Sequence, residues 1–140
     1  MQEVKAQCGE GHEHVQDAYL CTPLQEGLMV LSAKQPGAYV ARLVFRLPPS
    51  LDAERLKSAW QIVASTTEML RKRIIHMPGG ASIQVVFDNT ISWCVDAGLE
   101  SYLDKDRTAK MEYGSALTRY AIVGQDGGER HLVWTVHHAI

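Results

Sequence analysis

The sequence lacks long hydrophobic runs, basic stripes and closely spaced cysteines. No window approaches the roughly 18 uninterrupted apolar residues that a membrane-spanning helix needs, and the polar start is unlike a signal peptide. The 14 basic and 16 acidic residues are spread along the chain, so no segment would neutralise a phosphate backbone. Three widely separated cysteines, Cys8, Cys21 and Cys94, are typical of reduced thiols rather than of a disulfide framework. These absences predict a cytoplasmic protein without a membrane or nucleic acid partner.

What is present is the composition of one ordinary globular domain, with 46% hydrophobic and 21% charged residues over 140 positions. Residues 1–14 are polar, contain Gly9 and Gly11, and show no apolar period. We therefore expect a flexible lead-in or interdomain linker over residues 1–14 and a folded unit over residues 15–140.

Two helices are expected in the first half of this unit. Thr22-Pro23-Leu24-Gln25 indicates a helix start, because Thr can cap, Pro suits the first helical position and Gln can complete a capping box. Pro36-Gly37 would end that helix. A longer packing helix is expected from Leu51 to about Thr66. The predicted buried positions of the two helices are Leu24, Leu28 and Leu31, and Leu56, Ala59, Trp60 and Val63.

The remaining signals are mostly those of strands. Period-two alternation and β-rich runs predict strands at residues 39–47, 70–76, 82–87, 91–95, 116–123 and 131–138, with a third helix at 99–111. Met77–Ala81 and Gln125–Gly128 are turn signals, so two of the strand pairs should form hairpins. Asp104–Arg107 is expected to be a solvated helix face. Helices and strands alternate without repeats, which predicts an α/β fold in layers.

The most informative feature is the pair His137 and His138 at the tip of an apolar strand. Alternation places the two rings on opposite faces, so joint ligation of one metal ion is disfavoured. One imidazole should emerge from the apolar face, where partial desolvation keeps it neutral near pH 7 and suited to act as a general base. The alternative from spacing alone is two surface or core-edge histidines.

A second histidine group lies in the lead-in. Cys8, His12 and His14 are spaced closely enough to ligate a metal ion, but three such residues in a flexible tail are more often incidental. The prediction is therefore that the chain has no metal site.

Three ordered segments resemble the condensation domains of nonribosomal peptide synthetases. Residues 136–140, Val-His-His-Ala-Ile, resemble the start of the family's His-His-x-x-x-Asp-Gly signature. Residues 19–28 resemble the first core motif, especially the Pro-Leu-Gln-Glu-Gly-Leu form of fungal synthetases. Residues 68–74 are similar to the second motif, Arg-His-Glu-x-Leu-Arg-Thr-x-Phe, and residues 51–60 to the family's first long helix. The resemblance covers residues 15–140.

The second motif departs from the family pattern. Thr66 and Thr67 stand where the motif has Arg and His, and Lys72 and Ile74 replace its Thr and Phe. Arg71 matches the later Arg of the motif. In the family an arginine of this region pairs with the Asp of the histidine signature, so the resemblance implies that Arg71 supports the active-site loop. A solvated strand edge is the alternative for Arg71 and its basic neighbours.

The resemblance also implies a fold and a reaction. Condensation domains resemble chloramphenicol acetyltransferase: two α/β lobes, each a mixed or antiparallel sheet packed with helices, enclose a tunnel with the histidine signature inside. They join an aminoacyl or peptidyl thioester on one carrier protein's phosphopantetheine to the amine of an aminoacyl thioester on another. The resemblance assigns His138 as the residue that orients or deprotonates the amine or stabilises the tetrahedral intermediate, and His137 a more structural role.

The chain matches only the N-terminal lobe, and the signature is cut after Ile140. We therefore expect no amide formation by this polypeptide alone, no cofactor bound directly, and two kinds of partner: carrier proteins and the missing C-terminal lobe. One alternative is a noncatalytic module that docks a carrier protein or that lobe. Another is an acyltransferase of the same fold that uses acyl coenzyme A.

Overall fold

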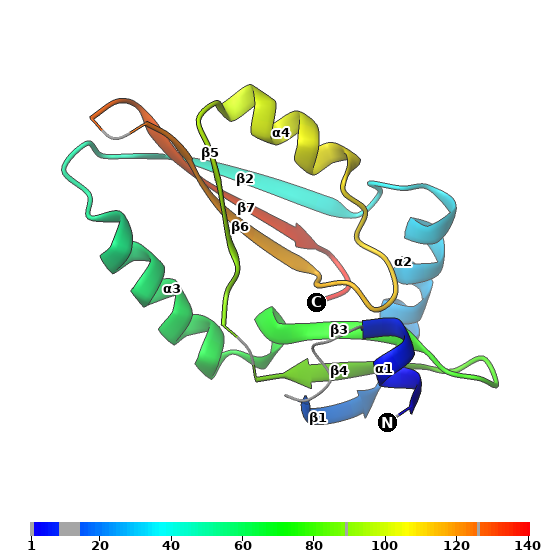
Figure 1. Cartoon of the computed structure of the whole chain (residues 1–140). Coiled ribbons are helices and arrows are strands. Elements are labelled where there is room, and N and C mark those ends of the chain that lie inside the picture. Colours follow the sequence, from blue (N-terminus) through cyan, green and yellow to red (C-terminus); the bar gives the residue numbers. More distant parts are fainter. Residues whose placement is uncertain (1, 9–14, 89, 126) are drawn as a thin grey trace.

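Two β-sheets and the helices around them make up the fold (Figure 1). The computed structural model of the chain describes residues 2–8, 15–88, 90–125 and 127–140. The helices are α1 (Gln2–Cys8), α2 (Pro23–Lys34), α3 (Ala53–Thr66) and α4 (Leu99–Thr108), with a short 3₁₀ turn, η2 (Glu68–Arg71). The strands are β1 (Val15–Leu20), β2 (Val40–Leu47), β3 (Lys72–His76), β4 (Ser82–Phe87), β5 (Trp93–Asp96), β6 (Thr118–Gly124) and β7 (Arg130–His137).

The smaller sheet has the order β1-β4-β3 and is antiparallel throughout. The larger sheet has the order β2-β7-β6-β5, in which only the β5–β6 pair is parallel. The predicted α/β class with mixed and antiparallel sheets is confirmed, as are both hairpins. None of the helices in the described part of the chain is long and apolar enough to cross a membrane.

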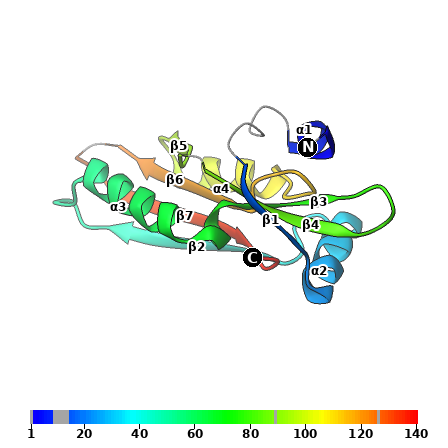
Figure 2. The same ribbon diagram turned by 90° about the horizontal axis from the view of Figure 1, so that it is seen from below.

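Helices α3 and α4 cover opposite faces of the larger sheet. Tyr102 and Leu103 of α4 pack against Val133, whereas Leu56 and Trp60 of α3 pack on the side of the adjacent strand residue, Leu132. Successive strand residues point to opposite faces, so the two contacts require the sheet to lie between the helices. Figure 2, the view from below, shows α3 in front of the strands of this sheet.

Helix α2 begins as predicted but turns a different side inward. Both hydrogen bonds of the capping box are present between Thr22 and Gln25. The buried residues of the helix are Met29 and Ser32, whereas Leu24, which was expected in the core, is 71% exposed and Leu31 is exposed as well. Apolar residues occur all round this helix, so the leucine spacing did not identify the inward side.

Helix α3 shows the same kind of difference. Asp52 caps its first turn, and Leu56 and Trp60 pack against the larger sheet as predicted. Val63 is exposed, contrary to the prediction, and so is Ala59. The buried residue of the last turn is Ala64 instead, and Arg71 of η2 donates to its carbonyl at 2.7 Å.

The first residues of the chain include a helix that the sequence did not predict. Residues 2–8 form helix α1, whose Val4 and Cys8 are buried against the smaller sheet. A helix of seven residues is too short to show an apolar period, which explains why the sequence indicated a lead-in. Residues 9–14, including His12 and His14, lie outside the described residues, so the proposed tail ligands are not tested. The division of the chain at residue 15 stays a prediction.

Candidate active site

The histidine turn, residues 137–140, follows the last strand of the larger sheet, and His137 is its buried member. Its side chain is 0% exposed. Nδ1 of the ring accepts a hydrogen bond from the Ala139 backbone N–H at 3.0 Å, and Nε2 lies 2.7 Å from the Ser32 hydroxyl. Because Nδ1 accepts, a neutral ring carries its proton on Nε2 and donates it to Ser32. Burial, together with the neighbouring His138, lowers the pKa of His137 below its ordinary value.

His138 is the exposed member of the pair. The residue is exposed, and its backbone N–H donates to the Tyr39 carbonyl at 2.8 Å. The prediction that the two residues face opposite sides agrees with this contrast in burial. One partly desolvated imidazole was expected, and in this chain it is that of His137, because α2 packs over this residue. An exposed imidazole on a fixed backbone can accept a proton from a substrate that approaches from solvent.

Gln25 connects the first motif to the histidine turn. Its Oε1 accepts the Thr22 backbone N–H of the capping box at 2.9 Å. Its Nε2 donates to the Ala139 carbonyl at 2.9 Å and also lies 3.3 Å from Gln84 Oε1. One side chain therefore starts α2 and holds the turn that presents His138.

A further polar residue, Gln84 of β4, extends this contact into the smaller sheet. Its Oε1 accepts from Lys72 Nζ at 2.9 Å, and its Nε2 donates to the Leu20 carbonyl at 3.1 Å. Gln84 was not singled out from the sequence, where an isolated glutamine in a strand carries no signal. Ser32 was also missed, although a serine within a largely apolar helix was a signal that could have found it.

Arg71 is the last residue of η2. Its four hydrogen bonds go to the Ala64 and Ser65 carbonyls, the Phe87 carbonyl and the Gln16 side chain. These bonds join the end of α3 to β1 and β4, and none of them reaches the histidine turn. The side chain is buried, so the alternative of a solvated strand edge does not hold for Arg71. Its pairing with an aspartate of the signature stays a prediction.

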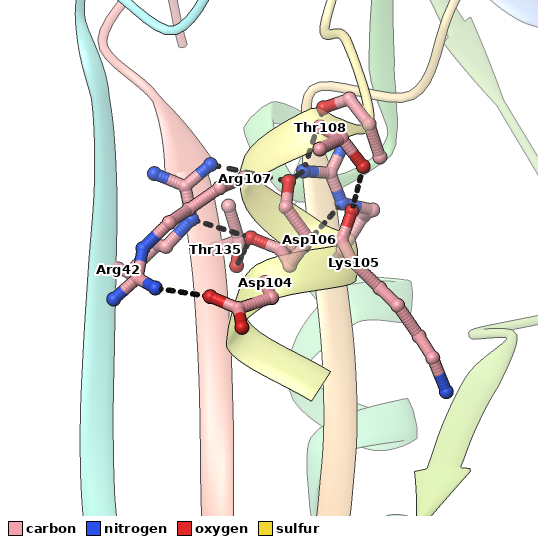
Figure 3. A network of polar contacts seen from close by, with 9 residues as sticks. Arg42, Asp104, Lys105, Asp106, Arg107, Thr108 and Thr135 are labelled. Atoms are coloured by element: carbon pink, nitrogen blue, oxygen red, sulfur yellow. Dashed lines mark hydrogen bonds and ion pairs between the residues drawn. The ribbon is translucent and has the colours of Figure 1, made fainter. Parts of the chain in front are cut away.

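A buried ion cluster anchors the strand that leads to the turn (Figure 3). Asp106 of α4 contacts Arg42 Nε at 2.6 Å and Arg119 Nε at 2.7 Å, and Thr135 donates to it at 3.0 Å. The three partners come from β2, β6 and β7 and are direct cross-strand neighbours. The predicted solvated face is therefore wrong for Asp106. Within the part of the chain that the structure describes, no three His, Cys, Asp or Glu side chains gather as metal ligands.

Comparisons with known proteins agree with the motifs. Residues 15–140 match the family model described as Condensation domain. The chain is 45% identical over 138 residues to the nonribosomal peptide synthetase gloA of Glarea lozoyensis, covering 99% of this chain and 2% of that protein. It is 42% identical over 143 residues to the nonribosomal peptide synthetase ecdA of Aspergillus rugulosus, covering 100% of this chain and 2% of that protein. The chain thus spans about 2% of the length of these relatives.

Solved structures share the fold. The starter condensation domain of rhizomide synthetase RzmA has a TM-score of 0.73 at 15% identity, covering 89% of this chain and 33% of that one. The first condensation domain of the calcium-dependent antibiotic synthetase, in complex with a substrate analogue, has a TM-score of 0.69 at 18% identity. The match covers 88% of this chain and 33% of that one.

Proposed function

The chain belongs to the condensation-domain family, and we propose that it is the N-terminal lobe of a nonribosomal peptide synthetase condensation domain, with His138 as its catalytic side chain. The observation that carries this proposal is the presentation of an exposed imidazole on a turn whose backbone is held from several sides. Gln25 binds the Ala139 carbonyl, His137 binds the Ala139 N–H, and the Tyr39 carbonyl accepts the His138 N–H.

The proposed reaction forms an amide from a thioester and an amine. The amine nitrogen attacks the thioester carbonyl, the C–N bond forms, the C–S bond breaks, and the departing thiolate takes up a proton as the thiol. His138 would take the proton that the amine loses, orient the amine, or stabilise the tetrahedral intermediate. Geometry decides such roles before pKa does, since the base must lie within hydrogen-bond reach of the amine.

The proposed partners are carrier proteins whose phosphopantetheine thiols hold both substrates, and the C-terminal lobe that completes the tunnel. No cofactor would bind to this lobe directly. The likeness to nonribosomal peptide synthetases supports these partners and a cytoplasmic location. In this proposal residues 1–14 are a lead-in or an interdomain linker, and Arg71 supports the loop through the aspartate of the signature.

The isolated chain should form no amide, because it carries His138 without the opposite tunnel wall. The test joins this chain to the C-terminal lobe of the condensation domain that it matches in the Glarea lozoyensis relative. Loaded carrier proteins are supplied, and the amide product is followed by mass spectrometry.

We expect the fusion to form the amide product and the chain alone to form none. The His138→Ala variant of the fusion should lose the product. His131→Ala is the matched control, because this histidine lies on β7 beside Glu129, away from the turn. Amide formation by the chain alone would contradict the expected inactivity. A folded fusion that stays inactive, while the relative's own domain works, would contradict the catalytic role.

The noncatalytic docking module is favoured by one observation, the exposed apolar side chains Leu20, Leu24 and Val30 at the end of β1 and on α2. In that case His138→Ala would leave carrier or lobe binding intact, and the wild-type fusion would form no product. Binding measured by calorimetry, beside the product assay, separates the two functions.

A further inference from the structure

Ser32 lies directly behind the histidine turn. It is 7% exposed, and its hydroxyl faces the fully buried ring of His137. It comes from α2, on the same buried side as Met29. Ser32 and His137, 105 residues apart in the sequence, thus form a polar contact next to a cluster of buried apolar side chains.

The hydrogen bonds around Ser32 have a single consistent direction. The Ala139 N–H donates to His137 Nδ1, so the imidazole proton is on Nε2 and is donated to the Ser32 oxygen. The Ser32 hydroxyl is then free to donate its own proton to the Ala38 carbonyl at 3.2 Å. Every donor in this relay has one acceptor.

The relay ends on the residue that follows His138. The Ala139 N–H is bound by the His137 ring, and the Ala139 carbonyl is bound by Gln25. Both backbone polar groups of the residue after His138 are therefore held, and the ring of His137 holds the N–H of the peptide that joins His138 to Ala139. If the Ser32 oxygen is lost, the buried Nε2–H loses its acceptor, and a ring with its proton on Nδ1 cannot accept the Ala139 N–H.

We propose that Ser32 is a positioning residue: its hydroxyl fixes the tautomer of His137, and through the Ala139 amide it sets the backbone that presents His138. The catalytic consequence rests on the proposed function, whereas the structural link between Ser32, His137 and the turn does not. Ser32 itself has no contact with reacting groups in this assignment.

The first test is NMR spectroscopy of the 140-residue chain. Nitrogen-15 shifts of the His137 ring report the tautomer, and amide exchange reports the Ala139 hydrogen bond. Ser32→Ala should change the ring shifts and speed exchange of the Ala139 amide by roughly tenfold or more. Ser32→Thr should restore both, because it keeps the hydroxyl, and Ser32 lines a hollow of about 390 Å³.

Two variants complete the comparison. Ser58→Ala is the matched control, since this exposed helix serine also donates its hydroxyl to a carbonyl, at Glu54, and exchange at Ala139 should stay within about twofold of wild type. Ser32→Cys keeps the shape and weakens the acceptor, so it answers the question if the alanine variant does not fold. Ring shifts and exchange that are unchanged in Ser32→Ala, or in its cysteine substitute, would overturn the proposal.

The second test measures product formation by the fusion described above. Ser32→Ala should lower kcat by roughly tenfold while KM stays within about twofold, and Ser32→Thr should restore kcat. An unchanged kcat beside altered His137 shifts would overturn the catalytic consequence. An inactive wild-type fusion would instead contradict the proposed function, and the NMR result would still decide whether Ser32 sets the turn.

Discussion

Asp106 offers the sharpest test of what holds the larger sheet together. Asp106→Asn preserves size and helix propensity and removes the negative charge that lies between two guanidinium groups. Arg42 and Arg119 approach opposite oxygens of the carboxylate at 2.6 and 2.7 Å, and Thr135 donates to one of them. The substitution leaves two like charges facing each other at the sheet surface.

The expected cost follows from burial. The Asp106 side chain is only 1% exposed, so the usual cost of breaking a buried ion pair, about 3–5 kcal/mol, sets the upper range. The two arginines are about a fifth exposed and keep their bonds to the Asp106 backbone carbonyl, so part of their charge stays solvated. A loss of about 2–4 kcal/mol in the free energy of unfolding is expected.

The assay is urea unfolding followed by circular dichroism near pH 7, with the midpoint and slope compared between variants. Asp104→Asn is the matched control, because Asp104 lies on the same helix, pairs with Arg107 at 2.7 Å and is 74% exposed. Its loss should stay within about 0.5 kcal/mol. A loss in Asp106→Asn below about 1 kcal/mol, or equal to that of the control, would refute the reasoning.

Acid titration gives an independent check of the same cluster. Burial alone would raise the pKa of Asp106, but the hydrogen bonds and charges of Arg119 and Arg42 outweigh it and hold the pKa below its ordinary value. A carboxyl with a lowered pKa in the folded chain stabilises the fold above its unfolded pKa, and this stabilisation is lost as the pH falls through the folded value. Below about pH 4, the free energy of unfolding of Asp106→Asn should therefore depend less on pH than that of the wild-type chain.

Three further outcomes are expected. Gly27→Ala should stabilise the chain by about 0.5–1 kcal/mol in urea unfolding, because this position lies within α2 and nothing is within 4 Å of the added methyl; a loss of stability would contradict the geometry. Burial lowers the pKa of His137, so the unfolded chain binds its proton first and stability should fall below about pH 6.5, by up to about 1.4 kcal/mol per pH unit, a slope that His137→Gln should remove. Gln25→Glu should keep the helix cap but lose the donor to the Ala139 carbonyl, with the Ala139 peptide shifting in NMR spectra and about 1 kcal/mol lost; an unshifted peptide would contradict this role.

The features that the sequence predicted correctly are governed by neighbouring residues. The capping box at Thr22 involves residues three positions apart, and the hairpin between β3 and β4 depends on Gly79 and Gly80, which adopt positive φ in its turn. The position of His137 at the end of a strand follows from the period-two alternation of residues 131–138. Such signals survive without knowledge of the tertiary fold.

The features that were missed depend on contacts between distant segments. Asp106 is buried because Arg42, Arg119 and Thr135, at separations of 64, 13 and 29 residues, converge on it. A charged residue in a charged helix looks solvated until those strands are placed. The exposure of His138 and the burial of His137 likewise depend on which side of α2 faces the sheet, which the apolar composition of that helix left undetermined.

Gln25 shows why the first motif and the histidine signature belong together. Glutamate and glutamine both complete a capping box, since either side chain can accept the Thr22 N–H. Oε1 of Gln25 accepts the Thr22 N–H. The other terminal atom of the side chain, Nε2, therefore faces the Ala139 carbonyl, 114 residues away in the sequence. Only an amide can donate there, because a carboxylate would place two acceptors against each other. The glutamine of the first motif is therefore required by the histidine turn rather than by its own helix.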